Sequence, residues 1–239
     1  MNAYIITTKN AFKSEKVEKL TQRCVDSCHK FNLKPILVNA VVPATLEKVY
    51  PGWPVREDYR ERLYNNYRRK AGKEPTDEIR NRMIVMQQCM TMSHYRTRQA
   101  IIERGDKVAV ILEHDAIIMR ELDKNLPYDK YAVNLTLREQ CTHGYTVNPE
   151  SARKYNNIYE KTGFAGHDNM NRYIHKGSDE LVEEIKVSPY QGVNHHGAGG
   201  PVVGGNALHE TQWDTHRGAL KTHLDYVPTT TTGVYNKEG

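Results

Sequence analysis

The sequence predicts an α/β fold, with a single domain in which a mostly parallel central sheet is flanked by helices. Three observations support this prediction. The chain opens with a strand, a helix and a second strand in close succession. A long amphipathic helix later leads into a fully apolar strand, and strands and a helix follow beyond it. A chain of 239 residues has room for one sizeable domain or two small ones, and we expect one.

Composition and charge narrow the class of protein. The hydrophobic fraction of 38% and the charged fraction of 26% are typical of a soluble globular protein. No stretch approaches the roughly 18 apolar residues that a membrane span requires, and the N-terminus lacks the pattern of a secretory signal. We therefore expect a cytoplasmic protein. The net charge of +5 suits a phosphate-bearing ligand without identifying one.

The N-terminal elements follow from their hydrophobic spacing. Residues 3–8 and 34–39 are short apolar runs, and between them residues 14–31 repeat apolar side chains at helical intervals. A strand, helix and strand in this order imply parallel strands joined by a right-handed crossover, and ligands collect at the carboxyl ends of such strands. Thr7 and Thr8 stand at one of these ends.

The cysteines do not have the spacing of a metal site. Cys24 and Cys28 lie four apart within the helical pattern, where two small apolar core residues are a better interpretation than two zinc ligands. Reduced thiols are expected in the cytoplasm.

Residues 43–78 look like an insertion, because they contain four prolines and no clear strand, with one helix in the middle. Six basic residues lie between positions 59 and 73, and three tyrosines are interleaved with them. Basic and aromatic groups together can hold a nucleic-acid backbone and its bases. A solvated helix face with half-buried tyrosines explains the pattern equally well.

A long helix is predicted over residues 76–104. Apolar and small side chains recur along it at steps of three and four, and Gly105 supplies its end. The members of this stripe are Ile79, Met83, Met86, Met90, His94, Thr97 and Ile101. The next strand, residues 107–112, is apolar on both faces and should therefore be a central strand of the sheet.

The sequence after residue 112 consists of a part with predicted strands and a helix and a C-terminal part of different composition. Strands are predicted at 131–135 and 143–149, and the segment 149–163 has the proline start and glycine end of a helix. Beyond residue 188 the composition shifts to glycine and histidine. We expect residues 1–190 to form the domain and residues 191–239 to be a tail or lid packed on it.

Three ionisable residues interrupt the apolar stretch "VAVILEHDAIIM" directly after the central strand. Glu113 and Asp115 are two apart and would share a side of an extended chain. Two carboxylates there could hold Mg²⁺ or Mn²⁺ together with a diphosphate, which would complete the oxygen shell of the metal. The alternative is a solvent-exposed turn that binds nothing.

The order of these motifs resembles glycosyltransferase family 25. Members carry a Ser-His pair upstream of an apolar strand that ends in Leu-Glu-Asp-Asp, and this chain has Ser93-His94 followed by "VAVILEHDAII". "HGYTVNPESARKY" and "HDNMNRY" are similar to later elements of that family, and "AYIITT" to its first strand. The sequence departs from the family at His114, which replaces an aspartate, and at Cys89, which lies one residue farther from the Ser-His pair.

The resemblance implies a GT-A (Rossmann-like) domain that binds a nucleotide-diphosphate sugar, most commonly a UDP-sugar, with Mn²⁺ or Mg²⁺. It implies that Asp115 and a tail histidine bind the metal and that Asp168 is the catalytic base. His195, His196 and His209 are available in the tail, and we choose His196. An N-cap role for Asp168, a core role for His94 and unliganded tail histidines are the alternatives. The family usually has an arginine after the first strand, and Lys13 or Lys16 would replace it here. The implied donor-binding residues are Thr7, Thr8, Lys13, Ser93, His94 and Glu113.

The resemblance does not identify the molecule that carries the acceptor hydroxyl. Family members act on lipopolysaccharide sugars or on hydroxylated protein side chains, whereas the basic insertion favours DNA that carries 5-hydroxymethylcytosine, as in some bacteriophages. Trp53, Arg68 and Arg69 would then hold an extruded base and its phosphates. A non-catalytic module that binds a sugar or a nucleic acid on the same fold is a further hypothesis. A metal-dependent phosphatase or nuclease would need more acidic residues at one strand end.

Overall fold

The computed structural model describes residues 1–12, 14–119, 121–122, 128–129, 132–135, 143–167 and 203–205. Its elements, in chain order, are β1 (Asn2–Thr7), α1 (Glu15–Lys30), β2 (Lys34–Asn39), α2 (Pro43–Leu46), α3 (Glu57–Ala71), α4 (Asp77–Arg104), β3 (Ala109–Glu113), β4 (Ala116–Ile118), β5 (Val133–Asn134), β6 (Gly144–Val147), α5 (Pro149–Thr162) and β7 (Val203–Gly205).

The main sheet has five strands in the order β2-β1-β3-β6-β5. β1 pairs in parallel with both β2 and β3, and β6 runs antiparallel to β3 and β5, so four of the five strands point the same way. This is the mostly parallel α/β sheet that the sequence predicts. β3 is its middle strand, which confirms the interpretation of the apolar run before Glu113.

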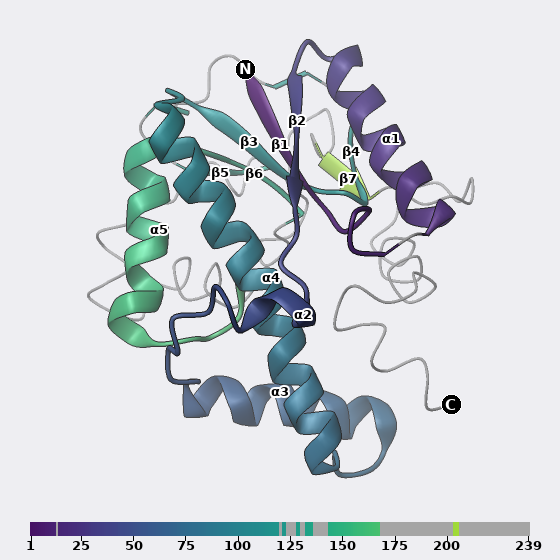
Figure 1. Cartoon of the computed structure of the whole chain (residues 1–239), viewed down its shortest axis with the longest axis vertical. Helices are drawn as coiled ribbons and strands as arrows, with labels where there is room; N and C mark the ends of the chain where they lie inside the picture. Colours follow the sequence, from purple (N-terminus) through teal and green to yellow (C-terminus); the bar gives the residue numbers. More distant parts are fainter. Residues whose placement is uncertain are drawn as a thin grey trace.

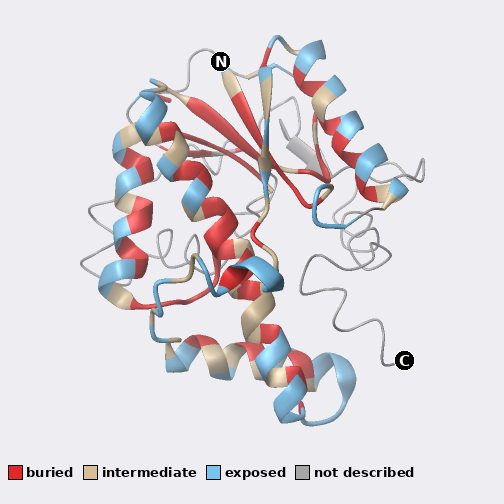
Figure 2. Ribbon diagram, in the orientation of Figure 1, coloured by how far each residue is buried: buried red, intermediate tan, exposed pale blue. Residues whose placement is uncertain are grey.

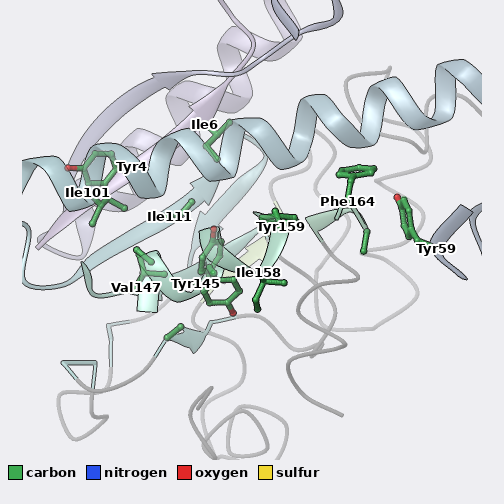
Figure 3. Packing of buried hydrophobic residues seen from close by; sticks show 14 of the residues in the cluster. Tyr4, Ile6, Tyr59, Ile101, Ile111, Tyr145, Val147, Ile158, Tyr159 and Phe164 are labelled. Carbon is green, nitrogen blue, oxygen red and sulfur yellow. The ribbon is translucent and has the colours of Figure 1, made fainter. Parts of the chain in front are cut away.

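Helices cover both faces of this sheet. α1 lies on one face, and α4 and α5 lie on the other (Figure 1). Side chains of the strands alternate between the two layers, so Ile5 and Leu112 pack with α1 while Tyr4 and Ile111 pack in the cluster with α4 and α5. Buried residues accordingly line the strands and the inward sides of the helices (Figures 2 and 3). The two faces thus have separate cores.

The insertion at 43–78 contains the expected middle helix, α3, and also one short helix, α2. α3 packs against the N-terminal half of α4, and this pair, which we call the helical arm, extends away from the sheet (Figure 1). Tyr59, Leu63 and Tyr67 are buried in the same cluster as Ile79 and Met83. The tyrosines that alternate with basic residues are therefore partly core residues of the arm.

Local capping explains where the long helices begin and end. The Thr76 hydroxyl accepts from the Ile79 N–H at the start of α4, and Gly105 ends the helix in the left-handed conformation at φ 69°. Asn148 caps α5, whose first residue is Pro149. These positions match the ends that the sequence predicts.

The stretch "VAVILEHDAIIM" forms two strands that belong to different sheets. β3 ends at Glu113, the chain turns at His114 and Asp115, and β4 pairs antiparallel with β7, with Ala116 opposite Gly205. Because of this turn, the prediction that Glu113 and Asp115 occupy one side of an extended chain is wrong. Although α4 has 28 residues, neither it nor any other helix in the described ranges is apolar enough over a sufficient length to cross a membrane.

Candidate functional site

A pocket opens at the carboxyl ends of β1, β2 and β3. β2 and β3 lie on opposite sides of β1, and in an open α/β sheet such a change of direction leaves a crevice where ligands bind. The pocket lies on the α4 side of the sheet. Its lining residues are Ile6, Thr8, Phe12, Ala40, Val41, Val42, Pro43, Met86, Cys89, Met90, Ser93, His94, Glu113 and His114.

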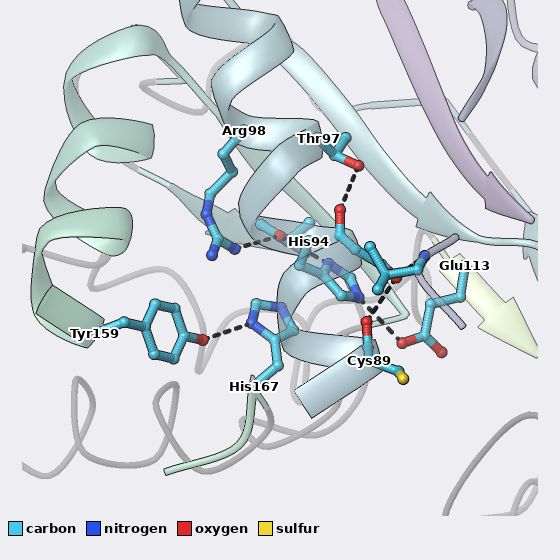
Figure 4. Close-up of polar contacts among 10 residues, drawn as sticks. Cys89, His94, Thr97, Arg98, Glu113, Tyr159 and His167 are labelled. Atoms are coloured by element: carbon cyan, nitrogen blue, oxygen red, sulfur yellow. Dashed lines mark hydrogen bonds and ion pairs between the residues drawn. The ribbon is translucent and has the colours of Figure 1, made fainter. Parts of the chain in front are cut away.

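Glu113 and His94 meet in this pocket. Glu113 follows Ala109 and Ile111 on the α4 face of β3, and His94 projects from the middle of α4. The His94 Nε2 lies 3.3 Å from the Glu113 Oε1 (Figure 4). The His94 side chain is 1% exposed and that of Glu113 is 15% exposed. The buried imidazole therefore supports a carboxylate at the pocket wall.

His94 is also the middle of a longer hydrogen-bonded chain. Its Nδ1 lies 3.0 Å from the Tyr145 hydroxyl, which accepts from the Arg98 Nη1 at 3.0 Å. The Arg98 Nε donates to the Asn156 Oδ1 at 2.7 Å, and its guanidinium lies 5.3 Å from the centre of the Tyr155 ring. We call Arg98, Tyr145, His94 and Glu113 the relay. Among the described residues, no carboxylate pairs with the fully buried Arg98.

His167 lies on the other side of His94. The two rings stack with centroids 3.9 Å apart, and the His167 Nδ1 lies 3.1 Å from the Tyr159 hydroxyl (Figure 4). Burial lowers the pKa of His167 well below its usual value, and the neighbouring His94 and Arg98 act in the same direction. Burial likewise raises the pKa of Tyr145, against the opposing effect of Arg98. Both groups are neutral at pH 7.

Of the predicted donor-binding residues, Thr8, Ser93, His94 and Glu113 come together at the pocket. Thr8 is 8% exposed, and its hydroxyl has no hydrogen-bond partner within the part of the chain that the structure describes. An unpartnered hydroxyl in a pocket wall is suited to bind a polar ligand.

Ser93 and Thr7 have structural contacts. The Ser93 hydroxyl accepts from the Val41 N–H at 2.8 Å and donates to the Cys89 carbonyl at 2.7 Å, which ties the segment after β2 to α4. The Thr7 hydroxyl lies 2.9 Å from that of Thr21 in α1, on the opposite face of the sheet from the pocket. Thr7 is therefore not part of the pocket lining.

The metal prediction gains no support from the geometry. Glu113 lines the pocket and Asp115 does not. The charge of Asp115 acts on Cys24 of α1, where hydrogen bonding to Cys28, burial and then Asp115 raise the pKa of the thiol. In the described ranges, no three histidine, cysteine or acidic side chains form a group that could hold a metal ion. His114, where the family has an aspartate, is buried and lines the pocket.

The predicted acceptor residues have partners in the protein. Trp53 stacks on Tyr159 with ring centroids 5.4 Å apart at 14°. Arg68 pairs with Glu61 and Glu74, and Arg69 donates to Asn66 at 3.4 Å. The basic face of the arm is thus partly neutralised by its own acidic residues.

Lys13, Asp168 and His196 lie outside the described residues, so their predicted roles in phosphate binding, catalysis and metal binding stay predictions.

Sequence reasoning missed Tyr145 and Arg98. Arg98 is four residues after His94 on the same helix, a spacing that places both on one face. That spacing was the available signal for Arg98. Tyr145 lies in "HGYTVNPESARKY", a segment that resembles the family, but no local pattern indicated its contact with His94.

Comparisons with known proteins found a weak structural similarity and no match in sequence. No protein-family model matches the sequence, and neither does any curated protein. Among solved structures, the chain is similar to the apo form of the glycosyltransferase GlyE of Streptococcus pneumoniae TIGR4, with 14% identity and a TM-score of 0.37. The match covers 72% of this chain and 42% of that one, so the chain spans less than half of its neighbour's length. A similarity of this degree carries no argument about fold or activity.

Proposed function

We propose that the protein is a glycosyltransferase that moves a sugar from a nucleotide-diphosphate sugar, such as a UDP-sugar, to an acceptor hydroxyl. The observation that carries this proposal is the 3.3 Å contact between His94 and Glu113 in the pocket. These residues belong to the two sequence motifs that resemble glycosyltransferase family 25, and 19 positions separate them. Their convergence where an α/β sheet binds ligands supports the resemblance.

The pocket suggests how the donor would be bound. The Thr8 hydroxyl and the Glu113 carboxylate offer polar contacts, while Met86, Met90 and Val41 supply an apolar wall. A carboxylate accepts hydrogen bonds from sugar hydroxyls, and apolar side chains exclude water from the reacting centre. Asp168 stays our candidate for the base that takes the proton of the acceptor hydroxyl.

Donor binding is tested first by thermal unfolding with a panel of nucleotide sugars, each with Mn²⁺ or Mg²⁺. A donor at 100 times its Kd stabilises the folded state by ~2.7 kcal/mol. Slow release of nucleoside diphosphate without an acceptor would then demonstrate turnover. A panel in which no nucleotide sugar raises the unfolding temperature or is hydrolysed contradicts the proposal.

Two threonine variants identify the pocket as the donor site. Thr8→Val and Thr91→Val each remove a buried hydroxyl that has no partner within the described ranges, but only Thr8 lines the pocket. Loss of one hydrogen bond to the ligand should raise the donor Kd about 3- to 10-fold in Thr8→Val. Thr91→Val should bind the donor like the unmodified protein. Equal effects of the two variants would place the donor elsewhere.

A divalent metal is part of the proposal, although the described residues alone do not form its site. Mn²⁺ or Mg²⁺ would neutralise the charge on the leaving diphosphate, with Asp115 and His196 as its expected protein ligands. EDTA should abolish donor hydrolysis, and Asp115→Ala should have the same effect. Asp26→Ala, which removes an exposed carboxylate of α1, is the control. Hydrolysis that persists in EDTA and in Asp115→Ala argues against a metal.

For the acceptor, we keep hydroxymethylated DNA as the substrate to be tested, in a protein that works in the cytoplasm. Binding to modified duplex should exceed binding to unmodified duplex and should weaken steeply with salt. Arg69→Gln should reduce both the affinity and the salt dependence, whereas Arg153→Gln, an exposed arginine of α5, should not. Absence of binding at low salt would exclude this acceptor and favour a glycan or protein hydroxyl.

A further inference from the structure

The relay has a defined direction at its buried end. A guanidinium only donates hydrogen bonds, so the Arg98 Nη1, 3.0 Å from the Tyr145 oxygen, makes that oxygen an acceptor. The phenol keeps one proton to donate. The His94 Nδ1 lies 3.0 Å away and is the acceptor for it. A ring nitrogen that accepts carries no proton.

The pocket end of the relay favours the same arrangement. An ionised carboxylate only accepts, and the Glu113 Oε1 lies 3.3 Å from the His94 Nε2. This longer contact, to a carboxylate that is 15% exposed, favours a proton on Nε2 less strongly than the 3.0 Å contact with Tyr145 does. An imidazolium with both nitrogens protonated would place a second positive charge in the same buried cluster as Arg98. Both ends of the relay therefore favour the neutral ring with Nε2–H.

We propose that Tyr145 and Arg98 are positioning residues, which hold His94 as the Nε2–H tautomer and thereby orient the Glu113 carboxylate toward the donor. This inference rests on the proposed function, because it takes the bound ligand of Glu113 to be the nucleotide sugar. Neither Tyr145 nor Arg98 lines the pocket. Both act on the donor only through His94 and Glu113.

The surroundings of the relay give it the rigidity that such a role requires. Tyr145 is 2% exposed and pairs in the sheet with Ile111 of β3, the strand that ends in Glu113. Arg98 is held by Asn156 of α5. Side chains fixed on strands and helices keep a binding group in place before the ligand arrives, which reduces the entropy lost on binding.

The tautomer is tested by ¹⁵N NMR of histidine-labelled protein at pH 7, with the His94 signals assigned from their loss in His94→Gln. The unmodified protein should show a protonated Nε2 and an unprotonated Nδ1. Tyr145→Phe removes the donor to Nδ1 and should give a mixture of both tautomers. Tyr155→Phe, a buried tyrosine that contacts Arg98 outside the relay, should leave the signals unchanged.

The variant Glu113→Gln changes the pocket end of the relay. In Glu113→Gln the Arg98 and Tyr145 contacts persist, so His94 should remain Nε2–H. An Nδ1–H ring or an imidazolium in the unmodified protein overturns the proposal. So does an unchanged tautomer in Tyr145→Phe or a switched tautomer in Glu113→Gln.

Donor affinity separates this inference from the proposed function. With the nucleotide sugar found in the panel, Tyr145→Phe should raise the donor Kd about tenfold, and Tyr155→Phe should leave it unchanged. A Kd that stays constant in Tyr145→Phe while the His94 tautomer changes refutes the positioning role. If no nucleotide sugar binds to the unmodified protein, the proposed function fails and the positioning role fails with it, while the NMR result still decides the tautomer.

Discussion

Trp53 lies stacked on Tyr159, with the two ring planes 14° apart and their centroids separated by 5.4 Å. The same indole meets the rings of Tyr50 and Tyr95 edge-on. Trp53 thus connects the segment before α3 to both α4 and α5. An aromatic ring in this position is a packing element, and its predicted contact with an extruded base stays a prediction.

Replacing Trp53 should therefore affect stability. Trp53→Ala should lower the free energy of unfolding by about 2–4 kcal/mol, because it removes a half-buried ring with three aromatic neighbours. Trp53→Phe keeps one ring and should lose less than half of that. Urea unfolding gives both values. A Trp53→Ala protein of normal stability that has lost DNA binding would support the original interpretation.

Gly163 should tolerate no side chain. It has φ 80°, and a Cβ there would lie 2.6 Å from the Pro54 carbonyl oxygen, which accepts from the Phe164 N–H. Gly163→Ala should cost at least about 2 kcal/mol of unfolding free energy, from backbone strain and from this clash. Gly72→Ala is the matched control, because Gly72 has φ 67° and open space around it, and it should cost about 1 kcal/mol. Equal losses of unfolding free energy in the two variants would mean that Pro54 moves away from the added Cβ at no cost in free energy.

Stability should fall in acid because of His167. Burial lowers the pKa of His167 in the folded protein, so below pH 6.5 the unfolded chain binds a proton that the folded chain excludes. The folded state therefore loses stability as the pH falls below 6.5, by up to about 1.4 kcal/mol per pH unit from this group. Urea unfolding between pH 7.5 and 5 should show a shallower dependence in His167→Gln. Parallel curves for the two proteins would show that His167 already binds its proton in the folded state.

Cys89 should react slowly although it lines the pocket. Burial raises the pKa of this thiol to about 12, so at pH 8 only about one molecule in ten thousand carries a thiolate there, against roughly a quarter for an ordinary cysteine. Mass spectrometry after brief iodoacetamide treatment should find Cys89 unmodified in the folded protein and fully modified in urea. Rapid labelling of the folded protein would require a thiol far more acidic than its burial allows.

The main sheet could be predicted from the sequence because its signals are local. Apolar runs, helical spacing and terminal residues such as Thr76 and Gly105 give β1, α1, β2, α4 and β3 within a few residues. Hydrophobic alternation cannot show that the chain turns at His114, because Ala116 to Ile118 are apolar in either case. The turn moves these residues into another sheet.

The site was predicted in part for the same reason. Glu113 and Thr8 stand at strand ends, which the order of elements brings together. The role of the Ser93 hydroxyl as a tie between Val41 and Cys89, and that of Tyr145 as a partner of His94, depend on contacts between residues about 50 positions apart. No local pattern encodes such contacts. The sequence also does not reveal that Arg68 would be paired with Glu74.

α4 runs without interruption from Asp77 to Arg104, a length of roughly 42 Å at 1.5 Å per residue. Its first turns are half of the helical arm, its middle carries Ser93 and His94, and its last turns pack beneath β1 and β3. The arm and the imidazole that contacts Glu113 therefore belong to one continuous helix. The position of the pocket wall and the position of the arm depend on the same element.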